Sequence, residues 1–303
     1  MKTAILSFLT LITIYFSQAQ EVNEAIEIIV ENDKMVLLDR YYTSGLFLGY
    51  KRSLESNFLF KKDSSNTLQL NIKLGNETYT PKNLHDFDTR LFDRPFAGWL
   101  FLKTELVRVN NTSLLSLGIE TGITGEESLA GKLQTWFHEF LNINDNPTWY
   151  QEIEFKFLLN LKAKYILNTL INNKQNLQYI GDISLGTKDI YVEYGLDYFI
   201  GKFNPLQKTS RIGAIDETVG NEFYGYIGLG YRYVVHNTLI QGSLDYSDTF
   251  FTSEIERHLF KFKAGTVLKI KNSAFKLGYN FNTRETPRST THAYGTLSFS
   301  QSF

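Results

Sequence analysis

Cysteine is missing from all 303 residues, which excludes disulfide bonds, thiolate metal sites and a lipid anchor carried on cysteine. An excess of either charge is missing too, because 31 Lys and Arg residues stand against 32 Asp and Glu residues. The sequence therefore predicts no surface for nucleic acid. Beyond the first residues, no apolar run is long enough to cross a bilayer as a helix, so any membrane integration has to use strands.

The first 19 residues are typical of a secretory signal peptide. Lys2 supplies the positive start, residues 5–16 the apolar core, and Ser17-Gln18-Ala19 a cleavage site of small residues. The apolar run is shorter than the roughly 20 residues that a transmembrane helix needs. We expect residues 1–19 to be removed and residues 20–303 to form one domain.

Aromatic residues are abundant, at 15% of the chain, while the mean hydropathy is slightly negative at −0.21. Near the C-terminus, Leu297, Phe299 and Phe303 share one face of a strand pattern, and hydroxyl side chains line the other. In residues 260–271, apolar side chains alternate with lysines, which could hardly face lipid. These patterns predict an all-β protein, a transmembrane antiparallel β-barrel with a polar lumen, although a soluble β-sandwich could show the same alternation. The final Phe303 resembles the terminal signal that the assembly machinery of bacterial outer-membrane barrels recognises.

Thirteen segments have strand patterns, but a barrel whose two ends both lie in the periplasm needs an even number. We expect that 177–185 is not a spanning strand, because the long 202–221 connection then faces outward and His236-Asn237 forms a periplasmic turn. The expected strands are then twelve, near residues 24–32, 43–54, 67–77, 95–107, 113–123, 150–166, 188–201, 222–235, 238–250, 255–270, 273–284 and 292–303.

A short helix is predicted in residues 128–140, where the apolar period changes from two to that of a helix. Gln134 and His138 are spaced i and i+4 and share one helix face. The remaining apolar positions form a stripe that we expect to lie on whatever the helix covers, with the Gln/His pair at its edge. A lone histidine beside such a stripe is more often a packing residue than a catalyst, so its role depends on its surroundings. The stripe contains Leu129, Leu133, Trp136, Phe137 and Phe140.

The expected topology brings polar residues of separate loops together at the extracellular rim. Strand ends and the loops at 78–94 and 124–149 all face that side. Asp93 and Arg94 are expected to pair with each other and brace the first of these loops. The polar residues gathered at the rim are Asn32, Asp33, Thr43, Lys82, His85, Gln134 and His138.

Five stretches match, in order, the outer-membrane lipid A 3'-O-deacylases (LpxR-like). They are Glu31-Asn32-Asp33, residues 39–50 (DRYYTSGLFLGY), Tyr79-Thr80-Pro81, residues 93–100 (DRPFAGWL) and the glycine-rich stretch that ends at His138. The chain resembles this family over roughly residues 30–150, and its second half matches only as barrel strands.

The resemblance implies a twelve-stranded barrel in the bacterial outer membrane that hydrolyses the 3'-linked acyl or acyloxyacyl ester of lipid A with Ca²⁺. It further implies lipopolysaccharide in the outer leaflet as the substrate and a monomeric protein. The family's lysine falls nearest to Lys82, which lies closer to the preceding tyrosine than the family spacing, with His85 as another occupant of that space. The other family positions fall on His138 (catalytic histidine), Gln134 (helix glutamine), Asn32 and Asp33 (Asn-Asp pair) and Thr43 (hydroxyl residue).

Ester hydrolysis needs a base for water and a means of neutralising the oxyanion. His138 can act as the base, and Gln134 can orient the imidazole or the water. Asn32 and Asp33 supply the oxygen ligands that suit Ca²⁺, and Thr43 and a lysine can bind the oxyanion or a lipid A phosphate. No Gly-x-Ser-x-Gly elbow is present, which favours direct attack by water. Two other functions stay open: an outer-membrane phospholipase, and a porin-like or structural barrel without activity.

Overall fold

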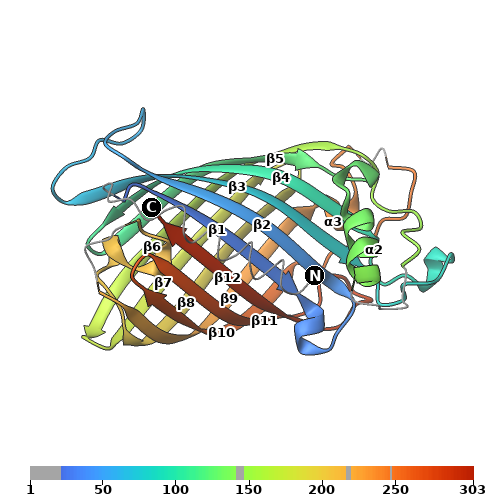
Figure 1. The fold of residues 1–303 in the computed structure, drawn as a ribbon. Helices are drawn as coiled ribbons and strands as arrows, with labels where there is room; N and C mark the ends of the chain where they lie inside the picture. The colour runs from blue at the N-terminus through green and yellow to red at the C-terminus, as the bar shows by residue number, and fades with distance from the viewer. Residues whose placement is uncertain (1–21, 141–146, 216–219, 246–247) are drawn as a thin grey trace.

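The computed structural model describes residues 22–140, 147–215, 220–245 and 248–303, and the predicted signal peptide lies outside these residues. Twelve antiparallel strands form a closed barrel in which β1 pairs with β12, as the sequence predicts (Figure 1). Among the described residues, no helix combines the length and apolar character needed to cross a membrane. The strands are β1 (Glu24–Asn32), β2 (Tyr41–Leu54), β3 (Asn66–Thr80), β4 (Ala97–Asn110), β5 (Ser113–Ile123), β6 (Phe157–Asn172), β7 (Gln175–Gly186), β8 (Asp189–Lys202), β9 (Glu222–Asn237), β10 (His258–Ile270), β11 (Ser273–Asn282) and β12 (His292–Ser302).

The two ends of the barrel differ in what they carry. The start of β1 and the C-terminal residue lie at one end, called here the terminal end, where the Phe303 N–H donates to the Glu24 carbonyl (2.9 Å) and the Glu24 N–H to the Phe303 carbonyl (3.1 Å). The opposite end, called here the helix end, carries most of the short helices (Figure 1). The helices are η1 (Asp33–Val36), η2 (Thr89–Leu91), η3 (Glu126–Ser128), α2 (Ala130–Phe140) and α3 (Thr238–Gln241) at the helix end, and η4 (Leu206–Lys208) and η5 (Ser210–Ile212) at the terminal end.

Two of the expected strand assignments are wrong, although the number of strands is right. Residues 175–186 form β7, a full strand paired on both sides. The stretch predicted as a strand at 238–250 begins instead with α3, because the Asn237 side chain caps the Leu239 N–H (3.0 Å) and Gly242 ends the turn at a φ of 74°. The number of strands is still even, because β7 takes the place of the strand expected at 238–250.

This change reverses the expected side of two connections. The segment 203–215 lies at the terminal end, where the Gln207 amide donates to the Ser65 carbonyl (2.8 Å). His236 lies at the helix end, and its Nε2 forms a hydrogen bond with the Thr238 hydroxyl (2.9 Å). A long connection indicates the outer side of the membrane only if it extends away from the barrel. Residues 203–215 instead fold into the lumen, so the length of this connection was misleading.

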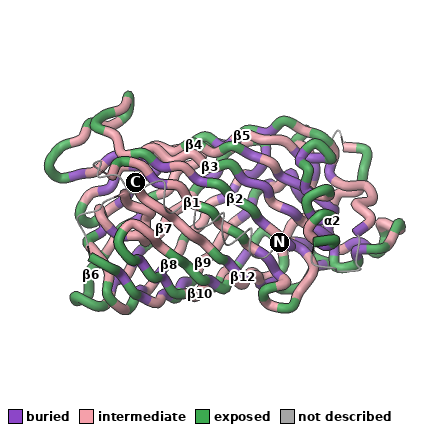
Figure 2. Tube along the Cα trace, viewed as in Figure 1, coloured by how far each residue is buried: buried purple, intermediate pink, exposed green. Residues whose placement is uncertain are grey.

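Each strand presents one face to the lumen and one to the outside, so exposed and covered residues alternate along the wall (Figure 2). On β3 and β4, the odd-numbered positions face the lumen, as the ion pair between Lys103 and Glu105 (2.9 Å) and the stacked rings of Trp99 and Phe101 show. The even-numbered positions of these strands face outward, and Leu102 is accordingly 45% exposed.

The lumen is filled with apolar side chains near both ends. At the helix end, Phe47, Trp99, Phe101 and Leu239 belong to one buried cluster. At the terminal end, Leu206 of the inward-folded segment packs among residues of β4, β5 and β6, chiefly Val107, Val109, Leu114 and Ile166.

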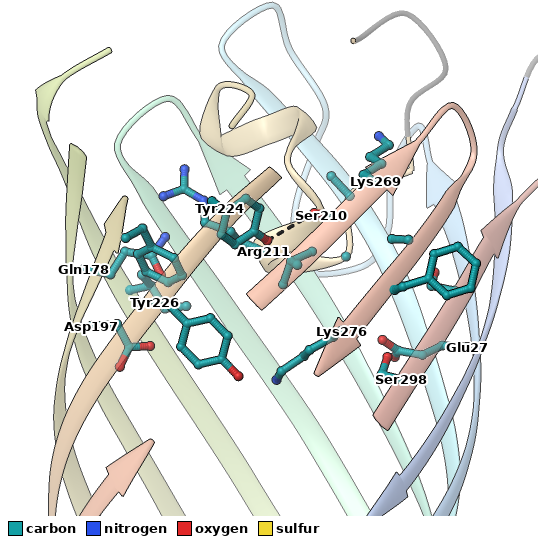
Figure 3. A pocket seen from close by; sticks show the side chains of 18 of the residues that line it. Glu27, Gln178, Asp197, Ser210, Arg211, Tyr224, Tyr226, Lys269, Lys276 and Ser298 are labelled. Atoms are coloured by element: carbon teal, nitrogen blue, oxygen red, sulfur yellow. Dashed lines mark hydrogen bonds between the residues drawn. The ribbon is translucent and has the colours of Figure 1, made fainter. Parts of the chain in front are cut away.

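Between these clusters the lumen is polar. Ion pairs cross it, among them Lys263–Asp197 (2.7 Å) and Lys261–Glu193 (2.7 Å). Two adjoining cavities of about 250 and 200 Å³ remain there. Figure 3 shows the larger one, with Tyr226 and Lys276 among the side chains around it. None of the residues predicted to be catalytic from the sequence lines either cavity.

Because both ends of the lumen are filled, we expect the purified protein to show no steady open-pore conductance in planar lipid bilayers. A general porin measured under the same conditions provides the positive control. A steady conductance comparable to that porin would contradict the filled lumen and favour a porin-like barrel.

Candidate active site

Helix α2 lies on the outer surface of the barrel wall, over β3 and β4, rather than in the lumen (Figure 1). Trp99 faces the lumen, so its neighbour Gly98 faces outward, and a Cβ atom there would collide with Ser128 Oγ and Ala130 Cβ. On the outward face of β3, the Asn76 side-chain amide donates to the Ser128 carbonyl (2.6 Å). The absent side chain and this hydrogen bond let the start of α2 lie flat on the wall.

Gln134 and His138 lie on the face of α2 that is turned to the wall, with only 4% and 3% of their surface exposed. Trp149 donates its indole N–H to Gln134 Oε1 (3.0 Å). An indole nitrogen can only donate, so this bond fixes which end of the amide points toward Trp149. The other end, Nε2, is buried and has no hydrogen-bond acceptor among the described residues. A directed amide donor therefore lies one helical turn from the His138 imidazole.

The expected orientation of this helix is wrong. The apolar stripe faces away from the barrel, and Trp136 is 60% exposed. The polar pair, expected at the edge, is the buried face together with Ala130. The contacts with the wall account for the difference, because Gly98 leaves room for Ala130 and Asn76 holds the Ser128 carbonyl, which turns the polar pair inward.

A second polar group forms around η1. The Asp33 carboxylate is fully buried and accepts hydrogen bonds from the Thr43 hydroxyl (3.2 Å) and the Arg40 backbone N–H (2.7 Å). The Thr43 hydroxyl is also 3.4 Å from Asp39 Oδ1, so two carboxylates face a single hydroxyl that can donate to one of them at a time. Lys34 pairs with Asp39 (2.6 Å).

Burial raises the pKa of the Asp33 carboxyl to about 7, and the negative charge of Asp39 adds to the increase. The hydrogen bonds from Arg40 and Thr43 act in the opposite direction and do not offset it. The protonated and ionised forms of Asp33 are thus close to balance at neutral pH. A cation bound beside the carboxylate would favour the ionised form.

An open cleft of about 670 Å³ adjoins this group at the rim of the barrel. The Lys82 backbone N–H donates to Asp93 Oδ1 (3.0 Å), and Asp93 Oδ2 accepts the Tyr41 hydroxyl (2.8 Å), which together fix the loop. The loop after β3 therefore does approach η1, as the sequence predicts. The cleft is lined by Lys34, Asp39, Lys82, His85, Asp93 and Arg288, among others.

The two polar groups are neighbours on the outer wall. Helix η1 packs against β12 and β2, whereas α2 packs against β3 and β4. Ser44 of β2 pairs with Thr78 of β3, close to the Asn76 that anchors α2. Neighbouring strands lie about 4.8 Å apart, so Thr43 lies about one strand from the part of the wall that α2 covers. Leu46, 52% exposed, lies on the outward face of β2 between them.

A sequence model of the family described as "Outer membrane protein LpxR" matches residues 4–303. The chain belongs to this LpxR family. Its fold is similar to that of LpxR from Salmonella typhimurium, with a TM-score of 0.73 at 22% identity over 92% of this chain and 100% of that one.

Other solved barrels are less similar to this LpxR-family chain. The β domain of the Bordetella autotransporter BrkA has a TM-score of 0.48 at 10% identity, covering 94% of this chain and 100% of that one. The translocator domain of NalP from Neisseria meningitidis has a TM-score of 0.43 at 9% identity, covering 99% and 96%. No curated protein sequence matches the chain.

The donors around η1 suit the Ca²⁺ that the resemblance implies for LpxR-like proteins. Among the described residues, no group of three or more His, Cys, Asp or Glu side chains could hold a metal, so a site here has to include neutral oxygens. Asp33 and Asp39 supply carboxylates on either side of the Thr43 hydroxyl. Hard oxygen donors of this kind are those that Ca²⁺ takes, and a positive ion there would oppose the burial that raises the pKa of Asp33. Asn32 contributes less freely, because its Oδ1 already accepts the Lys34 N–H (2.8 Å).

Two residues at the site of this LpxR-family chain were not predicted from the sequence. Asp39 stands at the head of the matched stretch 39–50, and its position before Thr43 was a usable signal. Trp149 lies 15 residues beyond Gln134 in an irregular segment, and no sequence pattern connects the two. The expected pair of Asp93 and Arg94 is replaced by an ion pair between Arg94 and Glu285 (2.8 Å).

The close approach at Gly98 makes a prediction about α2. Gly98→Leu should push the helix off the wall, and hydrogen exchange in residues 130–140 should become faster while the barrel stays folded. The matched control is Gly181→Leu, because Gly181 lies on β7 with no atom within 4 Å of its Cβ position. Unchanged exchange in the Gly98 variant would show that the contact does not hold the helix.

Proposed function

We propose that this LpxR-family chain is an outer-membrane hydrolase that removes the 3'-linked acyl or acyloxyacyl chain of lipid A. The observation that carries the proposal is the position of Gln134 and His138, buried between a helix and the outer wall of the barrel. A soluble substrate would be met in the lumen or above the rim. Polar groups on the outward surface are instead within reach of an ester that stays in the membrane.

In the proposed reaction, the neutral His138 imidazole accepts a proton from a water molecule as the water oxygen attacks the ester carbonyl carbon. The bond between that carbon and the sugar oxygen then breaks, which releases the fatty acid, and the imidazolium returns the proton to the sugar oxygen. Gln134 Nε2, directed by Trp149 and lacking an acceptor among the described residues, donates to the developing oxyanion.

The charge of the oxyanion requires more than one amide donor. Asp33, Asp39, Thr43 and the Asn32 oxygen would hold Ca²⁺. When bound, the ion supplies positive charge that polarises the ester carbonyl. Asp33 is ionised when the ion is bound. The Thr43 hydroxyl lies within hydrogen-bond distance of both the Asp33 and the Asp39 carboxylates and helps to position them.

The anionic sugar backbone of lipid A matches the rim cleft. Lys34, Lys82 and Arg288 line this cleft, and in our proposal they bind the lipid A phosphates while the acyl chains run down the apolar wall. The helix end then faces the outer leaflet, where lipopolysaccharide is found. Phospholipids also carry phosphate, so the same geometry would suit a phospholipase, and only a comparison of substrates separates the two.

His138→Ala should leave the barrel folded but lower deacylation by about 100-fold or more, which is the usual range for loss of a general base. The measurement is mass spectrometry of lipid A from a host with a known acylation pattern, before and after expression. His258→Ala provides the matched control, because His258 is exposed at the start of β10. Full activity of the His138 variant would contradict the role of the imidazole. Fatty acid released from phospholipid but not from lipid A would favour the phospholipase.

Ca²⁺ binding should depend on pH through Asp33. A carboxyl with a pKa of about 7 in the folded protein competes with the ion for a proton, so affinity should be about tenfold lower at pH 6 than at pH 8. Without the ion, the raised pKa means that the folded state holds a proton that the unfolded state has lost, so the free energy of unfolding should fall as pH rises from about 4 to 7.

Calorimetric titration with Ca²⁺ and urea unfolding measure the two effects. Asp33→Asn should abolish both the binding and this pH dependence, whereas Asp63→Asn, an exposed carboxylate at the terminal end, should change neither. Equal Ca²⁺ affinity at the two pH values would contradict competition between the ion and a proton at Asp33, and unchanged binding in Asp33→Asn would show that Asp33 is not a ligand.

A further inference from the structure

The face of α2 that points away from the barrel is apolar and uncovered. Leu133, Trp136 and Phe140 are 37%, 60% and 45% exposed, and Leu129 just before the helix is 44% exposed. The Trp136 and Phe140 rings stack with their centroids 5.6 Å apart, so the stripe forms one continuous surface. A surface helix of a soluble protein would place polar side chains on this face.

The pairing register shows which residues of the barrel wall adjoin α2. Asn76, Leu100, Ile123 and Phe157 form one row across β3, β4, β5 and β6. Asn76 holds the start of α2, and Phe157, in the same row, is 70% exposed on the outward face. The row of paired residues that starts beside α2 therefore ends in an exposed apolar side chain two strands away from β4.

The apolar surface of α2 also continues into the band that surrounds the barrel. Outward positions further along the neighbouring strands are large and exposed, between 45% and 51% for Leu102, Ile119 and Leu159. The charged residues of the helix, Lys132 and Glu139, lie to one side of the stripe and not within it. The helix thus has three sides: one lies against the wall, one is apolar and exposed, and one is charged.

We propose that α2 is inserted in the membrane, with the stripe Leu129, Leu133, Trp136 and Phe140 among the acyl chains of the leaflet at the helix end. The helix lies in the interface with its charged side toward water. Its wall-facing side holds Gln134 and His138 between the helix and the barrel wall, at the edge of the leaflet. An acyl chain can then reach these residues sideways from the leaflet, without passing through water. The insertion itself does not require the proposed hydrolysis.

The chain has three tryptophans, and their positions allow a direct test. Trp99 is 1% exposed inside the lumen, and Trp149 is held by Gln134, so Trp136 is the one in the stripe. The full chain is reconstituted in phosphatidylcholine vesicles whose acyl chains carry bromine, and its fluorescence is compared with that in ordinary vesicles. We expect strong quenching of the wild type and loss of most of that quenching in Trp136→Phe.

A second variant, Trp149→Phe, should remain quenched like the wild type. Folding of each variant is checked by the change in gel mobility on heating. Equal quenching of the wild type and Trp136→Phe would overturn the proposal, and so would quenching of Trp136 by iodide added to the water. Protection of Trp136 from both quenchers in a dimeric protein would assign the stripe to a second copy of the chain and also overturn it. Lipid A analysis of the same samples reports on hydrolysis separately, so the two proposals can fail independently.

Discussion

A helix can lie flat on a β-barrel only where the wall presents no bulky side chain, and in this protein that place is Gly98. The contact of Gly98 with Ser128 and Ala130, together with the hydrogen bond from Asn76, decides which face of α2 is turned inward. With the inner face fixed, the polar pair on α2 is buried and the apolar residues point outward. The same chain in water would have favoured the opposite orientation, because burial of apolar area is the larger gain there.

The fold was predictable as far as it depends on alternation along single strands. Alternation shows that a segment has two different faces, and it predicted the barrel. The even number of strands came from the requirement that both ends of the barrel lie in the periplasm. It did not show which of two doubtful segments crosses the membrane. That choice depended on the cap that Asn237 provides for α3, a local hydrogen bond that stops a strand. The side assigned to residues 202–221 followed from the same choice, and it was wrong because β7 adds one more crossing before this segment.

The candidate site was predictable where family motifs preserve short spacings. The pair Gln134 and His138, and the approach of Thr43 to Asp33, follow from separations of four and ten residues, and the structure brings each pair together. Contacts between irregular segments leave no regular spacing in the sequence. The hydrogen bond from Trp149 to Gln134 is an example. The roles of these residues remain predictions, because position alone does not report on chemistry. What the structure adds is the side of the wall on which they lie.

The paired ends of the chain have a consequence for biogenesis. The backbone of Phe303 both donates to and accepts from Glu24, so the last residue is part of the seam between β12 and β1. The hydrogen-bonding groups of the C-terminal strand edge are exposed only while that seam is open. An assembly factor that binds this edge by adding a strand to it would therefore be displaced when β1 pairs with β12. Completion of folding would then itself release the newly made protein.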